Sequence, residues 1–179
     1  MQRLIQEKYK EEVQKKQAEL TALQAQINPH FLYNTLDLIH WLALKYRAEE
    51  ISSVVNTLAK FFKLSLNDGR EVVTIGEELE HVRMYMEIQN KRFSNQIHMI
   101  FDIDASILEM TTVKLVLQPI VENAILHGIR EKHNKEGEIK ISGRLVEREI
   151  VLTVEDNGRG MPPDILEGIL QREKETAGD

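Results

Sequence analysis

Cysteine is absent from this sequence of 179 residues, and proline, with 4 residues, and aromatic residues, at 6%, are scarce. Without cysteine, disulfides, thiolate nucleophiles and thiolate metal ligands are all excluded. No apolar run approaches the roughly 20 residues that a membrane-spanning helix needs. The first twelve residues, MQRLIQEKYKEE, lack the apolar segment of a signal peptide. We therefore expect the chain to lie in the cytosol or to face it.

Basic residues are also in the minority, because 23 Lys and Arg stand against 29 Asp and Glu, a formal net charge of -6. Nucleic-acid binding generally requires a basic face that neutralises phosphates, so we expect no nucleic acid among the partners. The remaining composition, 42% hydrophobic and 29% charged, is typical of a globular protein. The length allows one domain of ordinary size or two small ones.

Helix formers dominate the first half of the chain. Residues 2–25 are rich in Glu, Lys and Gln, with apolar residues at spacings of three and four, which predicts a coiled-coil-like signalling helix over residues 1–26. Residues 31–47 and an apolar run over residues 51–62, joined by the short connection AEE, predict an antiparallel helical hairpin. One hairpin cannot cover its own apolar stripe, so we expect two chains to pair in a four-helix bundle.

A proline interrupts this helical half in the stretch QAQINPHFLYNTLD, residues 24–37. Proline inside a helix costs about 3 kcal/mol. Either the helix ends at Asn28 and restarts, or Pro29 bends a continuous helix. The bend is the preferred interpretation, because it would set His30 apart from the packed face as a reactive group. Asn34, one turn later, would face the same side as His30.

The second half begins after NDGR, residues 67–70, which is a turn signal and the expected domain boundary. Strands are predicted at EVVTI and NQIHMIFDID, and EIKISGRLV with REIVLTVED predicts a β-hairpin. Helices are predicted over residues 74–93, where Thr74 and Glu77 have capping-box spacing, and over residues 111–129. Strands interleaved with helices predict an α+β fold for this half.

The predicted helix QPIVENAILHG carries polar residues opposite its apolar face. Asn123 and His127 are four residues apart and so should meet on the helix surface, and Glu122 adjoins Asn123. A partly exposed helix with a merely solvated polar face would have the same pattern. This helix alone therefore leaves the function open.

The loop VEDNGRGMP, which follows a predicted strand, combines a carboxylate with two glycines. Gly158 and Gly160 permit positive φ and a close approach of the backbone to a ligand, and Asp156 is an acceptor for the exocyclic amine of a base. A D-x-G-x-G run by itself is also typical of ordinary turns. The conjunction of this loop with the polar helix is the stronger signal.

Three stretches together carry a specific resemblance. NPHFLYNTL, VENAILHG and EDNGRGM, in this order and spacing, resemble the phosphoacceptor box, the asparagine box and the first glycine box of sensor histidine kinases, in the YesM-like subgroup. The resemblance covers residues 20–165. It implies a dimerisation and phosphoacceptor hairpin over residues 27–68. It also implies an ATP-binding α/β sandwich of the Bergerat type, shared with the gyrase and Hsp90 ATPases, over residues 69–179.

The same resemblance implies a role for each matching residue. His30 would accept the γ-phosphoryl group of ATP and pass it to an aspartate of a response-regulator receiver domain. An exposed neutral imidazole is a sufficient nucleophile for this transfer, and Asn34 would position water for hydrolysis of the phosphohistidine. The cofactors would be ATP and Mg²⁺, and the chain would form a homodimer. The remaining implied roles are Glu122 as the base, Asn123 as the Mg²⁺ ligand, His127 near the phosphates, Asp156 at the adenine amine, and Gly158 and Gly160 around the pocket.

The sequence departs from the family pattern at its C-terminal end, QREKETAGD. A lid, a second glycine-rich phosphate loop and closing strands would normally follow, so we expect an incomplete sandwich with weakened nucleotide binding. The upstream sensor is expected to be missing as well. We interpret the chain as the cytoplasmic piece of a membrane receptor, attached to the membrane only through a missing upstream segment.

Two other functions compete with the kinase. A non-catalytic module would dimerise and dock a response regulator, which the missing second glycine box favours. An ATPase switch would keep the nucleotide fold alone, and NPHFLYN counts against it because such relatives need no histidine beside a helix-bending proline.

The remaining histidines are expected to be structural. His81 is predicted on an exposed part of its helix. His127 and His133 are six residues apart across a loop, but no third ligand completes a metal site there.

Overall fold

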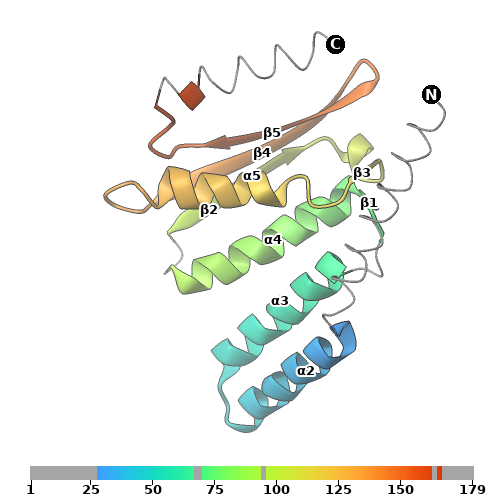
Figure 1. The fold of residues 1–179 in the computed structure, drawn as a ribbon, viewed down its shortest axis with the longest axis vertical. Helices are drawn as coiled ribbons and strands as arrows, with labels where there is room; N and C mark the ends of the chain where they lie inside the picture. Colours follow the sequence, from blue (N-terminus) through green and yellow to red (C-terminus); the bar gives the residue numbers. More distant parts are fainter. Residues whose placement is uncertain (1–27, 67–69, 94–95, 163–164, 167–179) are drawn as a thin grey trace, which may run out of the picture. The chain divides into compact units, whose positions relative to one another are not determined.

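The computed structural model describes residues 28–66, 70–93, 96–162 and 165–166 (Figure 1). The chain divides into two compact units, the first ending at Ala59 and the second beginning at Lys60, and each is described by itself. The predicted signalling helix over residues 1–26 and most of the turn at 67–70 lie outside the described residues.

Two helices, α2 (Pro29–Lys45) and α3 (Glu49–Leu66), form the predicted hairpin; the last turns of α3 belong to the second unit. The expected bend at Pro29 is wrong. Asn28 is extended, with φ -75° and ψ 103°, and its side chain accepts a hydrogen bond from the Phe31 amide at 3.1 Å. Pro29 therefore occupies the first position of α2, where its missing N–H has no intrahelical partner to lose.

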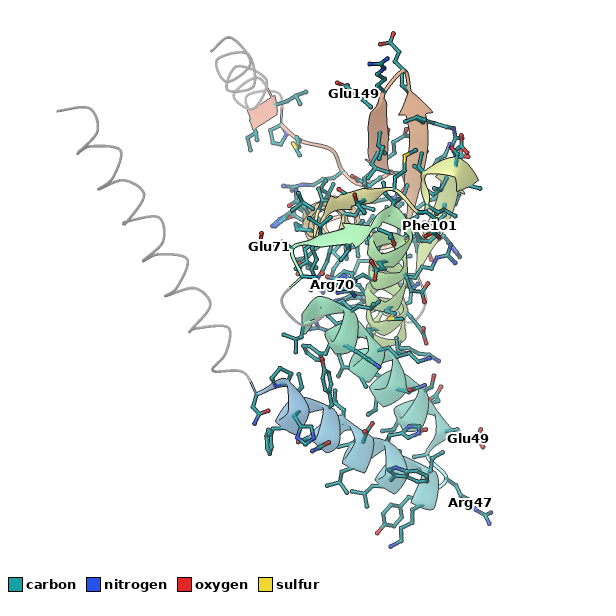
Figure 2. The ribbon with its side chains drawn as sticks, turned by 90° about the vertical axis from the view of Figure 1, so that its right-hand side faces the viewer. Arg47, Glu49, Arg70, Glu71, Phe101 and Glu149 are labelled. Carbon is teal, nitrogen blue, oxygen red and sulfur yellow. The ribbon has the colours of Figure 1, made fainter. Side chains whose placement is uncertain are left out.

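A C-terminal cap ends α2 and sets the connection to α3. The Ala48 amide donates to the Ala43 carbonyl at 2.8 Å and the Arg47 amide donates to the Leu44 carbonyl at 3.0 Å, which is the Schellman pattern. Arg47 takes the left-handed conformation, φ 56°, that this pattern requires. Figure 2 labels Arg47 and Glu49 on either side of this connection. The short connection therefore has a defined geometry.

The second unit contains two sheets and the helices between their strands. A small antiparallel sheet pairs β1 with β3, and the larger sheet has the order β2-β4-β5, with β2 parallel and β5 antiparallel to β4. The predicted β-hairpin, formed by β4 and β5, and the predicted α+β class are confirmed. The elements, in chain order, are β1 (Val72–Thr74), α4 (Ile75–Arg92), β2 (Ile97–Ile103), η2 (Ala105–Ile107), β3 (Thr111–Val113), α5 (Gln118–Asn123), the π-helical η3 (Ala124–Ile129), β4 (Gly137–Val146) and β5 (Glu149–Asp156).

The core of the second unit lies between the β2-β4-β5 sheet and the helices α4 and α5, which cover one of its faces (Figure 1). Alternate residues of β4 are buried, as expected for a strand with one covered face. Thr74 and Glu77 form the predicted capping box at the start of α4. The fully buried residues of this core include Ile75, Val82, Val121, Ile125, Ile129, Ile139 and Ile141.

The helix predicted over residues 111–129 begins later than expected. Thr111–Val113 are β-branched and pair with β1 instead, and Leu115 takes a positive φ of 62° that no helix allows. The Glu78 carboxylate accepts hydrogen bonds from three successive backbone amides, those of residues 115–117. Helix α5 therefore starts at Gln118, after this loop.

The expected exposure of His81 is also wrong. Its side chain lies in the interior of the second unit, with 3% of its surface exposed. The Phe61 ring stacks on it, with ring centroids 4.3 Å apart. Periodicity could not identify this burial, because the covering residue belongs to a different helix.

Candidate functional site

His30 stands exposed on the first turn of α2. The Asn34 side-chain nitrogen lies 3.2 Å from His30 Nδ1, so the two side chains meet as their spacing predicts. Nε2 of His30 bonds to no residue in the described part of the chain. The ring is therefore oriented through one nitrogen and presents the other to solvent.

Glu122, Asn123 and His127 occupy the helix formed by α5 and η3. Asn123 and His127 are exposed, while Val121 and Ala124 point into the core. The second part of the helix has π geometry, with the backbone N–H of residue 130 bonded to the carbonyl of residue 125 at 2.9 Å. Such π-helical turns occur frequently at functional sites.

Tyr85 on α4 contacts Glu122 in a way that the sequence did not reveal. The buried phenol makes side-chain hydrogen bonds with Gln89 and Glu122. Burial and the Glu122 carboxylate raise the pKa of Tyr85 to about 12, against a smaller lowering by Gln89 and Arg92. The phenol therefore stays protonated at neutral pH and acts as a hydrogen-bond donor to the Glu122 carboxylate.

Asp156, the last residue of β5, lies against the end of the helix. Asp156 Oδ1 accepts the Gly158 amide at 2.8 Å. A Cβ on Gly158 would overlap the Gly128 backbone, and a Cβ on Gly128 would lie 2.6 Å from Asp156 Oδ1. Gly160 has a positive φ of 75°, so the two predicted glycines serve different needs: close approach at Gly158 and backbone conformation at Gly160.

Two further contacts fasten this loop. The Arg159 amide donates to the Gly128 carbonyl at 3.2 Å, and its guanidinium forms an ion pair with Glu131 at 2.5 Å. Glu131 also lies 3.7 Å from His127 Nδ1. His127 and Glu131 are four residues apart, and that spacing was the only sequence signal of the pair. Arg159 has no such signal, because the loop and the helix are far apart in the chain.

These residues fit a purine nucleotide. Asp156 is held by Gly158 through one oxygen, and its second oxygen bonds to no residue that the structure describes. The absence of side chains at Gly128 and Gly158 lets the loop lie directly against the helix end. The loop itself is exposed rather than enclosed.

Asn123 is an exposed amide on this helix that would supply one oxygen to Mg²⁺. Within the described ranges, no group of three or more His, Asp and Glu side chains could hold a metal ion. Mg²⁺ commonly keeps several waters and is bound through substrate phosphates and few protein groups. A single amide such as Asn123 is compatible with that role, whereas His127 and His133 gain no third ligand.

Comparison with known proteins covers most of the chain. Residues 18–97 match the family described as "Histidine kinase". Residues 110–178 match the family described as "Histidine kinase-, DNA gyrase B-, and HSP90-like ATPase". In the described part of the chain, no helix is long and apolar enough to cross a membrane.

Curated relatives agree with these matches. The chain is 42% identical over 171 residues to the sensor histidine kinase YesM of Bacillus subtilis, covering 93% of this chain and 30% of that protein. It is 37% identical over 152 residues to the sensor protein LytS of Oceanobacillus iheyensis, covering 84% and 26%. It is 36% identical over 141 residues to the sensor histidine kinase BtsS of Escherichia coli K12, covering 79% and 25%. The chain thus spans less than a third of the length of these relatives.

Proposed function

Since the chain belongs to the sensor histidine kinases, we propose that it phosphorylates His30 with ATP and passes the phosphoryl group to an aspartate of a response-regulator receiver domain. The observation that carries this proposal is the exposed His30 ring, oriented through Nδ1 by Asn34. A structural histidine would have little need of both features. His40, ten residues later on the same helix, has its Nδ1 within 3.0 Å of Ser52 Oγ across the hairpin.

His30 Nε2 is the nitrogen available for attack. Because the Asn34 side-chain nitrogen donates to Nδ1, the proton of the neutral ring is on Nε2, and it must leave as Nε2 attacks. ATP with Mg²⁺ supplies the γ-phosphoryl group. Nε2 forms the new bond to phosphorus while the bond to the bridging oxygen breaks, and that electron pair leaves with ADP. The proton released from Nε2 passes to Glu122 in this proposal, and Nδ1 keeps its hydrogen bond from Asn34.

The second unit supplies the nucleotide site in this proposal. Asp156 accepts a hydrogen bond from the adenine amine through its second oxygen, and the loop containing Gly158 and Gly160 borders the base. Asn123 holds Mg²⁺, and His127 lies near the phosphates. Tyr85 orients the Glu122 carboxylate, because the phenol donates to it from a buried position. Positioning and charge neutralisation of this kind account for most of the catalysis of phosphoryl transfer.

The active form in this proposal is a homodimer built through the hairpin. Several large apolar side chains of α2 are exposed, including Phe31, Leu38 and Trp41. A second hairpin would cover them in a four-helix bundle. The location remains the cytoplasmic side of the membrane, where ATP and a receiver domain are available.

The first test is phosphate incorporation from γ-labelled ATP with Mg²⁺. We expect label that is labile in acid and stable in alkali, and that is lost in His30→Gln. His40→Gln is the matched control on the same helix and should retain the label. Label that survives His30→Gln would refute the assignment of the phosphoacceptor.

Nucleotide binding is tested separately by calorimetry. Asp156→Asn should abolish binding, because the amide presents a donor where the adenine amine needs an acceptor. Glu155→Gln, which changes the exposed acid next to it, should bind as the unmodified chain does. A folded dimer that binds no ATP would instead favour a docking module without kinase activity.

A further inference from the structure

A group of polar residues, two of them buried, connects the last turn of α3 with α4 and with the loop before α5. We call its four members, Ser65, Glu78, His81 and Lys114, the His81 cluster. His81 Nε2 lies 2.6 Å from Ser65 Oγ, and Lys114 Nζ donates to the Ser65 carbonyl oxygen at 2.6 Å. That carbonyl lies at the end of α3, where carbonyls lack intrahelical partners. All four members belong to the second unit.

The hydrogen bonds determine which nitrogen of His81 carries the proton. Ser65 Oγ donates its only proton to the Phe61 carbonyl oxygen at 2.8 Å, so it must accept from Nε2 of His81. Nδ1 is then an unprotonated acceptor, and it is buried without a partner among the described residues. Burial lowers the pKa of His81, with Glu78 opposing and Lys114 reinforcing the shift. The neutral ring is therefore the form that fits this site.

A cavity of about 10 Å³, lined among others by Glu78, His81 and Lys114, lies within the cluster. That volume is close to the minimum that admits one water molecule. A water molecule bound in this cavity would donate a hydrogen bond to Nδ1 of His81, which has no partner among the described residues.

Glu78 extends the cluster to the start of α5. Its side chain is 2% exposed, and its carboxylate accepts the amides of Leu115, Val116 and Leu117 at 2.6, 2.9 and 3.1 Å. Leu117 immediately precedes α5. Leu115 is held at a positive φ, which a side-chain-bearing residue adopts only when its surroundings impose it. The backbone that leads into α5 is therefore fixed by the cluster.

We propose that the His81 cluster couples the last turn of α3 to the start of α5, so that it positions the helix that carries Glu122 and Asn123. Lys114 joins both ends directly, because its side chain binds Ser65 and its backbone continues into the loop held by Glu78. A change at one end must alter the free energy of the other, and the effect is reciprocal. The link to nucleotide binding rests on the proposed function, whereas the coupling itself does not.

Amide hydrogen exchange without nucleotide tests the coupling. Ser65→Ala should speed exchange at the amides of residues 115–117 about five- to tenfold, because the cluster loses the acceptor for His81. Ser65→Thr keeps the hydroxyl and its bond to the carbonyl four residues earlier, so it should restore slow exchange. Ser53→Ala, an exposed change on the same helix, should have no effect. Unchanged exchange at residues 115–117 in Ser65→Ala would overturn the proposal.

General destabilisation is distinguished by the amides of Ile139 and Ile141 in the core strand β4. Equal acceleration there and at residues 115–117 would also overturn the proposal, because it would indicate global unfolding rather than a local link.

Addition of ATP and Mg²⁺ tests the link to the nucleotide site. Bound nucleotide should slow exchange in the last turn of α3, residues 63–66, about fivefold, and Ser65→Ala should remove this protection. Calorimetry on the same samples separates the two hypotheses. Absence of binding would count against the proposed function, and the exchange at residues 115–117 would still decide the coupling. Binding with no change at residues 63–66 would overturn the link.

Discussion

The two units of the chain differ in whether their buried apolar residues form a core. Among the described residues of the first unit, Leu36, Ala43 and Val55 are the buried apolar side chains, while Trp41 is 69% exposed and Tyr46 75%. The second unit buries a continuous core between one sheet face and two helices. A hairpin with this much exposed apolar surface is typical of an interaction site. The second unit thus has a core of its own, whereas the hairpin leaves a surface that the partner hairpin would cover in the proposed dimer.

The largest expected effect tests the packing of the second unit. Ile141→Ala removes a fully buried side chain of β4 and should lower the free energy of unfolding by about 2–5 kcal/mol. Val151→Ala, an exposed change on the neighbouring strand, should cost less than about 0.5 kcal/mol. Urea denaturation measures both. Similar losses in the two variants would break the comparison, because the core would then not dominate stability.

The next effect tests the dependence of the hairpin on a partner. Trp41→Ala should weaken dimerisation by about 2 kcal/mol, because large aromatic side chains commonly dominate such interfaces. Val113→Ala removes an exposed apolar side chain of the second unit and should leave dimerisation unchanged. Sedimentation equilibrium gives both dissociation constants. A chain that stays monomeric at all concentrations would contradict the predicted four-helix bundle.

A smaller effect is expected at the start of α4. Thr74→Ala removes the hydroxyl that accepts the Glu77 amide at 3.1 Å and should cost about 1 kcal/mol of unfolding free energy. Thr74→Ser keeps the hydroxyl and should cost much less. If the two variants lose equal stability in urea, the cap is not the reason for the loss.

The smallest effect is a pH dependence from His81. Because burial lowers its pKa in the folded state, the unfolded chain takes up this proton first as pH falls below about 6.5. The contribution of the neutral His81 to stability should therefore be fully present above pH 6.5. It should decrease as pH falls from 6.5 toward the lower pKa of the folded state. His81→Gln should flatten this part of the stability curve, measured by urea titrations between pH 7 and 5. An unchanged slope would show that His81 does not titrate between the two states.

Local pattern was sufficient for most elements of the fold. The capping box of Thr74 and Glu77 marked the start of α4, and the β-rich run over residues 148–156 marked β5. Both features depend on residues close in sequence. The helix predicted from residue 111 was wrong because Thr111–Val113 pair with β1, which lies far earlier in the chain.

In the candidate site, too, the features that are local in sequence were predictable and the contacts between distant segments were not. The proximity of His30 and Asn34 follows from helical spacing, and the glycine-rich loop after β5 was recognisable from composition. The contact of Tyr85 with Glu122 was not, because it joins two helices. The ion pair of Glu131 with Arg159 likewise joins segments that no periodicity relates.

The sequence by itself determined most helices and strands, the exposed histidine and the glycine-rich loop, because each depends on backbone preferences and spacing within a few residues. Only the tertiary structure decided that His81 is buried, that Glu78 holds the loop before α5, and that Gly128 and Gly158 lie in contact. These features arise where distant segments pack together. Burial and hydrogen-bond partners there depend on neighbours that the local sequence does not specify.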